Sequence, residues 1–301
     1  MAMPANRNHQ QKRTTRLAPY LWILPAILVY GIFKLVPLVS GVYMALLRWD
    51  GIEEPRFIGL RNFEKILNDK LTLLVLGNNV EYAVLTVIGK IALSLFLAIM
   101  LNQALRGRTF YRTSLFMPVV MSFVVIGILW RWLFNTEFGL LNNLFESVGL
   151  GFLAQDWLGD TDIALKSLTL VDIWKWYGFH MVIFLAGLQA IPGELYEAAK
   201  IDGASVWQQF RHVTLPMLQP VMIVNVTISL MGAFNVFDIP YVMTEGGPAN
   251  STNVMALHIY LRGFKFYRFG FSAALSYVLL TIVTLVAALQ LWLMTRVDNT
   301  E

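Results

Sequence analysis

Ionisable side chains inside long apolar stretches are the first candidates for chemistry in this sequence. There are five such residues: Lys34, Lys90, Asp172, Lys175 and Asp238. A charged side chain in the middle of a membrane helix costs about 2.5–3.5 kcal/mol on insertion scales, so each of them needs a partner or a role. Asp172 and Lys175 are three residues apart on one helix face, where they can neutralise each other. Alternatively, Asp172 faces a cavity and its carboxylate accepts hydrogen bonds from a hydroxyl-bearing ligand.

Sequence signatures of self-contained catalysis are absent. The chain has no G-x-x-x-x-G-K-[ST] phosphate loop, no H-E-x-x-H pair and no G-x-S-x-G elbow. It has no cysteine, which excludes thiol catalysis and Cys-ligated zinc. The four histidines (His9, His180, His212 and His258) are scattered along the chain, so a histidine metal cluster is not expected. We therefore expect no catalytic residue and no metal site.

The most informative polar segment is 191–216, which reads IPGELYEAAKIDGASVWQQFRHVTLP. It predicts two short helices at a membrane surface. Pro192 can open the first helix, because its missing N–H costs nothing there. Gly203 can end that helix in the left-handed conformation, Ser205 can cap the next helix, and Pro216 can start the following span.

Two interpretations of segment 191–216 stay open on the residues alone. Ala198 and Ala199 leave a small-residue surface that another protein can approach closely, and Glu194, Glu197 and Asp202 supply acidic groups for a basic partner. In that case the segment is a docking hairpin. Otherwise it is an ordinary amphipathic loop lying at the lipid headgroups.

The elements that carry these residues must be membrane helices. Of 301 residues, 57% are hydrophobic and only 14% are charged, and the mean hydropathy is +0.59, which is the composition of a membrane protein. Six apolar stretches predict spans at about 19–47, 79–103, 110–134, 167–191, 217–243 and 270–295. The chain then divides into a basic tail at 1–17, one all-α membrane domain at 18–296 and a short tail at 297–301.

The distribution of charge predicts the orientation. Arg7, Lys12, Arg13 and Arg16 precede the first stretch, and the loop between stretches two and three also carries several arginines. Positively charged loops stay in the cytoplasm, so both termini and segment 192–216 are expected there. The last loop contains Arg262, Lys265 and Arg268 on the predicted outer side, so the agreement with this rule is incomplete.

Segment 191–216 resembles the "EAA" loop of the permease subunits of ATP-binding cassette (ABC) importers. The matching residues are Glu197, Ala198, Ala199, Gly203, Leu215 and Pro216. In that family the loop is the coupling helix that sits in a cleft of a cytoplasmic ATPase. The resemblance therefore implies an ATPase-coupling site made of Glu197, Ala198, Ala199, Asp202, Gly203, Leu215 and Pro216.

Other segments are similar to the sugar-importer branch, and in particular to the first permease of the maltose and glycerol-phosphate type. They are FIGLRNF at 57–63, VDIWKW at 171–176, FNVFD at 234–238 and TEGGPANST at 244–252. Glu245 departs from the pattern, because a glycine is common at that turn. We expect this change to alter the flexibility of the loop.

The resemblance also implies a substrate pathway along the fourth and fifth spans. In these relatives both spans line the sugar site, where a carboxylate accepts sugar hydroxyls and an aromatic face packs on the CH groups of the ring. The corresponding candidates here are Asp172, Trp176, Phe179, Ser229 and Asn235, and Ser122 in the third span is a weaker one. Each of these residues can also serve packing alone.

The fold and partners implied by the resemblance are those of a type I ABC importer permease in a bacterial or archaeal cytoplasmic membrane. We expect a heterodimer with a second permease, two ATPase subunits that hold ATP and Mg²⁺, and an extracytoplasmic binding protein that delivers a sugar. No cofactor is expected on this chain. Two rivals remain: a proton-coupled secondary transporter with Lys90 or Asp238 as relay, and an intramembrane hydrolase that uses Asp172 and Asp238 as a carboxylate pair.

Overall fold

The computed structural model describes residues 20, 22–103 and 106–298, so the predicted tail at 1–17 and the last residues of the predicted tail at 297–301 lie outside the described part. The described chain is almost entirely helical, with one two-stranded antiparallel hairpin. Its elements are α2 Val36–Ala45, β1 Leu47–Arg48, β2 Arg56–Phe57, α3 Arg61–Asn68, α4 Lys70–Asn102, α5 Arg108–Val120, α6 Phe123–Leu133, α7 Leu140–Ser147, α8 Ala164–Ala190, α9 Gly193–Ile201, α10 Val206–Gln209, α11 Leu215–Met217, α12 Gln219–Phe234, α13 Asp238–Thr244, α14 Met255–Tyr260 and α15 Phe269–Asp298. Three π-helical turns, at Gly31–Leu35, Phe210–Thr214 and Leu261–Lys265, interrupt the helices.

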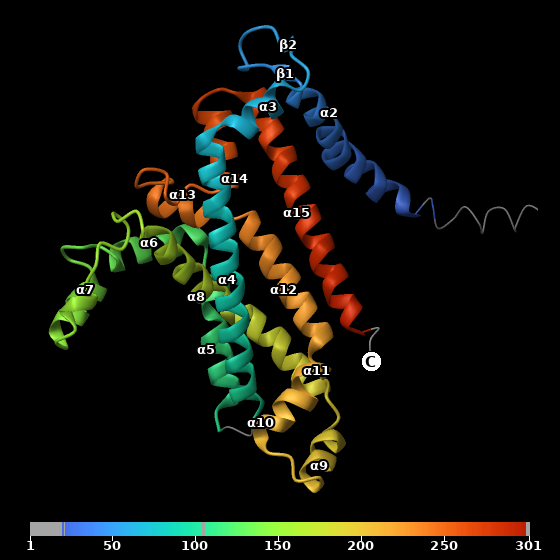
Figure 1. The fold of residues 1–301 in the computed structure, drawn as a ribbon, viewed down its shortest axis with the longest axis vertical. Coiled ribbons are helices and arrows are strands. Elements are labelled where there is room, and N and C mark those ends of the chain that lie inside the picture. Colours follow the sequence, from blue (N-terminus) through green and yellow to red (C-terminus); the bar gives the residue numbers. More distant parts are fainter. Residues whose placement is uncertain (1–19, 21, 104–105, 299–301) are drawn as a thin grey trace, which may run out of the picture.

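Long helices run along the main axis of the molecule, and short elements cover its two ends. In Figure 1, β1, β2 and α3 lie at one end, whereas α9 and α10 lie at the other. The C-terminus of α15 points toward the end that carries α9 and α10. We call the two ends the β end and the hairpin end.

Three helices are long and apolar enough to cross a membrane by themselves, and they are Trp22–Ala45, Lys70–Asn102 and Phe269–Trp292. Three further pairs of helices have the required length and composition together but bend between their two members, which raises the number of spans to as many as six. The all-α membrane class expected from the sequence is therefore confirmed.

Two of the apolar stretches differ from the single helices expected from the sequence. Stretch 110–134 is divided into α5 and α6, which meet at an angle of 97°. Stretch 217–243 is also divided. Helix α12 begins at Gln219, with Pro220 in its first turn, and ends at Phe234, and α13 is a separate helix. At 1.5 Å per residue, the 13 residues of α5 extend only about 20 Å.

A buried lysine closes the break between α5 and α6. Lys175 on α8 donates hydrogen bonds from Nζ to the carbonyls of Pro118 (3.3 Å), Val119 (3.2 Å) and Met121 (2.6 Å). These carbonyls lie at the end of α5, where a helix leaves backbone acceptors without partners. The three ammonium donors thus satisfy three acceptors, and a positive charge lies at the negative end of the helix dipole.

Helices α4, α8 and α12 pack together at the centre, and α4 and α8 share a buried ion pair. Lys90 Nζ lies 2.5 Å from Asp172 Oδ2, and the two side chains are only 4% and 5% exposed. The expectation that Asp172 and Lys175 neutralise each other is therefore wrong. Asp172 takes its partner from the neighbouring helix, which leaves Lys175 to the carbonyls of α5.

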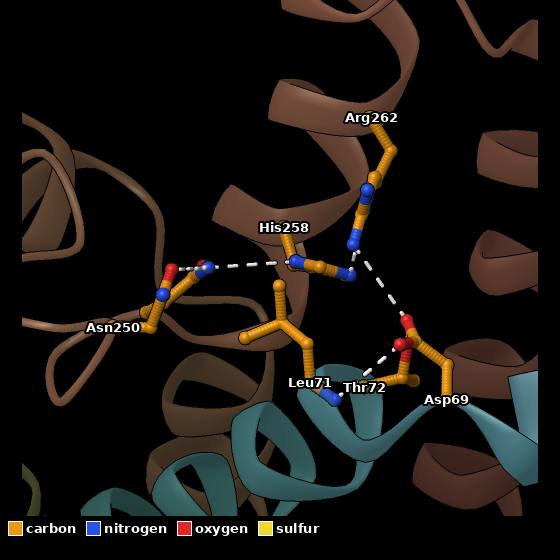
Figure 2. A network of polar contacts seen from close by, with 7 residues as sticks. Asp69, Leu71, Thr72, Asn250, His258 and Arg262 are labelled. Carbon is orange, nitrogen blue, oxygen red and sulfur yellow. Dashed lines mark hydrogen bonds and ion pairs between the residues drawn. The ribbon is translucent and has the colours of Figure 1, made fainter.

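A network of polar contacts fastens the β end (Figure 2). Asp69 caps α4 by accepting from the Leu71 amide (3.4 Å) and the Thr72 hydroxyl (2.7 Å). The same carboxylate lies 3.6 Å from the Arg262 guanidinium, and Arg262 Nε donates to Nε2 of His258 at 3.3 Å. The network joins the start of α4 to the segment around α14.

His258 takes part in this network as a neutral ring. Burial, followed by the nearby Arg262 charge, lowers the pKa of His258 to about 4, although Asp69 acts in the opposite direction. A neutral imidazole is also what the geometry requires, because a protonated Nε2 could not accept from Arg262.

The buried ion pair leads to a test by charge removal. In Lys90→Met, Asp172 stays buried without its cation, so we expect the free energy of unfolding to fall by about 3–5 kcal/mol. The double variant Lys90→Met/Asp172→Leu should recover most of this loss, because no charge remains. Lys34→Met, at an exposed lysine of the first helix, is the control. Thermal unfolding in detergent measures all four proteins, and equal losses in the single and double variants would contradict the pairing.

The neutral state of His258 makes stability depend on pH. The folded pKa lies below the ordinary value of 6.5, so the unfolded chain binds the proton more tightly and stability falls as the pH drops from about 7 to 5. The shift corresponds to a loss of about 2 kcal/mol at pH 5. A His258→Gln variant keeps an acceptor for Arg262 but cannot titrate, so its acid loss should be smaller. Identical melting shifts in wild type and variant between pH 7 and pH 5 would refute this assignment.

Candidate functional site

The segment that connects α8 to α12 forms a hairpin that projects from the helical body. In Figure 1, α9 lies beyond the lower end of α4, and α10 lies next to that end. None of the residues of α9 is buried. Glu197 and Ala198 are exposed and Ala199 is half-buried, while Asp202 and Gly203 are exposed at the turn. The residues predicted as a coupling site therefore lie on an accessible surface.

The local sequence explains the sharp turn of this hairpin. Helix α9 begins directly after Pro192 and ends at Ile201. Gly203 then adopts φ +75°, a conformation that favours glycine, and the Ala204 amide donates to the carbonyl of Ala199 at 2.9 Å. This confirms the predicted helix end at Gly203.

The second helix of the hairpin is capped as expected. Ser205 Oγ accepts from the Gln208 amide (3.3 Å), and Gln208 Oε1 accepts from the Ser205 amide (2.7 Å). This reciprocal pair is a capping box. Because both ends of the turn are held by local hydrogen bonds, the hairpin keeps its shape while its outer surface stays free of contacts within the described chain.

The base of the hairpin is held by one polar contact and one apolar cluster. The hydroxyls of Tyr196 and Thr214 lie 3.0 Å apart and connect α9 to the returning segment. Leu188, Ile191 and Leu218 are buried in a cluster that also includes residues of α4 and the lower part of α8. Leu215 and Pro216 lie at the entry to α12 and are exposed. The base of the hairpin is therefore packed against both α8 and α12.

The structure adds an apolar tip that sequence reasoning did not single out. Ile201, Val206 and Trp207 are 86%, 84% and 67% exposed, and they lie on either side of the Gly203 turn. The signal was present in the sequence as large apolar residues next to a predicted surface turn. Such residues on a capped, projecting hairpin are suited to insertion into an apolar cleft of another protein.

Charges of both signs surround the apolar tip. Glu194, Glu197 and Asp202 are exposed acids, while Lys200 and Arg211 are exposed bases on the same hairpin. The acidic groups expected for a basic partner are thus exposed, and basic groups lie beside them. Charges around an apolar centre favour one orientation of a docked partner more than they add affinity.

Asp172, one of the predicted pathway residues, is not open to a ligand in this structure. Its side chain is buried and paired with Lys90. Its carboxylate lies between α4 and α8 and is engaged with Lys90, so in this structure it does not face an open cavity. Asp172, in the motif VDIWKW at 171–176, therefore joins α8 to α4 through its ion pair with Lys90.

Trp176 and Phe179 keep a partly open aromatic face on α8. Both are half-buried, with ring centroids 5.8 Å apart in an edge-to-face arrangement. The Trp176 ring also lies 6.1 Å from that of Phe123 on α6, and Lys175 Nζ lies 5.4 Å from its centre. The structure thus brings these two predicted residues together beside the break between α5 and α6.

Ser122 lies at the same break, in the position that caps α6. It is exposed, and its hydroxyl accepts from the Val125 amide at 3.3 Å. Ser122 and Trp176 therefore belong to one region, since Phe123 contacts the Trp176 ring. A hydroxyl and two aromatic faces can contact a polar ligand that also has CH groups, whereas the Lys175 ammonium beside them is buried and engaged with backbone carbonyls.

The two predicted residues on α12 differ from each other. Ser229 is 2% exposed, and its hydroxyl has no hydrogen-bond partner among the described residues. Asn235 is exposed at the end of α12, where its amide donates to the carbonyl of Met231 at 2.8 Å. Ser229 is thus enclosed by the protein, whereas Asn235 remains accessible.

The loop with the predicted departure at Glu245 shows why glycine is common there. Glu245 follows α13 with φ +52°, a region that favours glycine. Thr252 holds the loop closed by donating to the Gly247 carbonyl at 2.7 Å, and its hydroxyl lies 2.6 Å from that of Thr244. These contacts close the loop on itself, and the expected effect of Glu245 on its flexibility stays a prediction.

Within the described part of the chain, no group of three or more histidine, cysteine, aspartate or glutamate residues could hold a metal ion. A cleft of about 940 Å³ lies at the β end, far from Trp176, and is lined by charged and aromatic residues that include Arg48, Asp50, Arg262 and Phe266. Backbone amides of Ile52 and Glu53 lower the pKa of Asp50 in this region. We find no arrangement of side chains there that indicates catalysis.

Comparison with known proteins places this geometry in a family. Residues 90–299 match the model of the binding-protein-dependent transport system inner membrane component family. The arabinooligosaccharides transport system permease protein AraP of Bacillus subtilis is 36% identical over 92% of this chain and 88% of the relative. The lactose transport system permease protein LacF of Rhizobium radiobacter is 35% identical over 93% of this chain and 95% of the relative.

The fold has a close counterpart among solved structures. A bacterial ABC transporter involved in the import of the acidic polysaccharide alginate superposes with a TM-score of 0.83, at 22% identity, over 96% of this chain and 99% of the matched chain. Because the match with these relatives and with the family model extends over most of the sequence, the chain belongs to the family of binding-protein-dependent transport system inner membrane components.

Proposed function

We propose that this chain is the permease subunit of an ATP-driven ABC importer and forms part of the translocation pathway for a sugar or oligosaccharide. The observation that carries the proposal is the rigid, projecting hairpin between α8 and α12. Its apolar tip is largely exposed, although the Trp207 ring packs 5.4 Å from that of Phe210 within the hairpin, and its base is continuous with two central helices. Relatives named for arabinooligosaccharide and lactose transport support the choice of a sugar.

The hairpin is the proposed contact with a cytoplasmic ATPase. Glu197, Ala198, Ala199, Asp202 and Gly203 would sit in a cleft of that subunit, and Leu215 and Pro216 would connect them to α12. Closure of two ATPases around ATP and Mg²⁺ would move the hairpin, and the central helices would turn as rigid bodies. No cofactor and no covalent chemistry are assigned to this chain.

A second permease is the proposed partner within the membrane. The first helix is Trp22–Ala45, and its most apolar window of 18 residues contains no buried residue. A pathway between two permeases would also cover the half-buried face around Trp176. An extracytoplasmic binding protein would deliver the substrate at the β end, and a solved alginate importer with its periplasmic protein bound supports this arrangement. Both termini would then lie in the cytoplasm.

The two rival functions are not favoured. A proton relay through Lys90 would have to break its buried ion pair with Asp172, and a secondary transporter would leave the projecting hairpin without a role. A carboxylate pair for hydrolysis would need Asp172 and Asp238 to meet. Instead, Asp172 pairs with Lys90, and Asp238 is exposed at the first residue of α13.

Gly203→Asp tests docking of the hairpin. The larger side chain would strain the left-handed turn and place a new charge beside the apolar tip. We expect substrate uptake to fall at least about tenfold, which corresponds to a loss of about 1.4 kcal/mol of docking energy. The ATPase should also no longer copurify with the variant. Gly59→Asp is the matched control, since Gly59 has φ +60° and open space but lies at the β end. Equal ATPase recovery from both variants would disprove the docking role.

Trp176→Ala tests the aromatic face of the pathway. Loss of one aromatic contact should raise the substrate concentration for half-maximal uptake about 2- to 10-fold, while basal ATPase activity and complex assembly stay unchanged. Trp22→Ala, at an 85% exposed tryptophan of the first helix, controls for the loss of a membrane tryptophan. Unchanged uptake in Trp176→Ala would make this ring a packing residue only.

A further inference from the structure

A buried hydrogen bond joins the two helices that carry the hairpin. His180 on α8 and Asn225 on α12 are 2% and 0% exposed, and His180 Nδ1 lies 2.8 Å from Asn225 Oδ1. No sequence motif pointed to this pair. It is a directional contact between two helices that otherwise meet through apolar side chains in this region.

The contacts around the pair set the direction of the hydrogen bond. The Asn225 amide nitrogen donates to the carbonyl of Val221 on its own helix at 3.2 Å, which turns Oδ1 toward α8. Because an amide oxygen only accepts, the His180 ring must carry its proton on Nδ1 and donate it. One specific tautomer of His180 therefore holds α8 against α12.

The pair lies at the upper edge of the apolar cluster at the base of the hairpin. About 15 Å of helix separates His180 from the end of α8, and about 9 Å separates Asn225 from the start of α12. Between the pair and the hairpin, a Cβ at Gly187 would come within 2.7 Å of Val221, so the helices are closely packed there. Apolar packing resists separation, but the attraction is non-directional and constrains the relative position of the helices less strictly than a hydrogen bond does.

We propose that the His180–Asn225 hydrogen bond is a positioning contact that fixes the register of α8 against α12, so that movement of the hairpin displaces both helices as one unit. Without it, α12 can slide or rotate against α8, and part of the hairpin movement is lost before it reaches Trp176 and Ser229. The inference rests on the proposed function, because it assumes that an ATPase moves the hairpin. Its distinctive consequence is a change in coupling, measured as substrate transported per ATP hydrolysed.

The test uses the complete importer reconstituted in liposomes, with this chain as wild type, His180→Leu or His180→Gln. Leucine removes the donor, whereas the glutamine amide can still donate to Asn225. We expect His180→Leu to lower the transport-to-ATP ratio at least threefold while binding-protein-stimulated ATP hydrolysis stays within twofold of wild type. His180→Gln should restore most of the ratio, which a simple loss of packing volume would not predict.

Two further variants separate positioning from general destabilisation. Thr86→Val removes an equally buried hydroxyl of α4 that bonds only carbonyls of its own helix, so the ratio should stay at the wild-type value. The double variant His180→Leu/Asn225→Leu should lower the ratio no more than His180→Leu alone, because both changes remove the same contact.

The outcomes distinguish failure of the inference from failure of the proposed function. If wild-type uptake depends on ATP and His180→Leu leaves the transport-to-ATP ratio unchanged, the positioning role is wrong. An equal decrease in Thr86→Val would overturn it as well. If wild-type uptake proceeds without ATP or without the ATPase subunits, the proposed function itself fails.

Discussion

The requirement that every charge inside the helical core be matched by a partner determines much of this architecture. Lys90 and Asp172 satisfy it by pairing across α4 and α8, the two longest helices that pack at the centre. An unmatched charge in this position would be expelled or would draw water into the core. The ion pair thus sets the register of α4 against α8, and the remaining helices pack on this frame.

The same requirement explains the break between α5 and α6. A helix that bends by 97° exposes carbonyls that lipid cannot satisfy. Lys175 supplies the missing donors from α8, and it can do so because Asp172 is already engaged with Lys90. Two charges of one sequence motif therefore have two structural roles, and the aromatic residues around them, Trp176 and Phe123, keep a half-buried surface beside the break.

The parts of the fold that depend on local sequence could be predicted, whereas those that depend on contacts between distant helices could not. The apolar stretches, the turn at Gly203 and the cap at Ser205 follow from hydropathy and backbone preference, which act within a few residues. The three-residue spacing of Asp172 and Lys175 favoured a local pair, but Lys90 lies closer in space although it is far away in the sequence. The division of stretch 110–134 was missed because its hydropathy is continuous, although Pro118 and Ser122 are local signals of a helix end and a helix start. The donors that stabilise the break come from α8 and could not be predicted.

The candidate site likewise has one part that the local sequence predicted and one part that it did not. The hairpin could be recognised because its glycine, its alanines and its flanking prolines lie within one short segment. The contact between His180 and Asn225 left no such signal, since an isolated histidine and an isolated asparagine on two apolar helices are compatible with any orientation of their side chains. Yet a hairpin can transmit force only if the helices behind it move together. Apolar packing supplies cohesion between α8 and α12 without direction, so the proposed role of the directional hydrogen bond above that packing is to make both helices follow the hairpin.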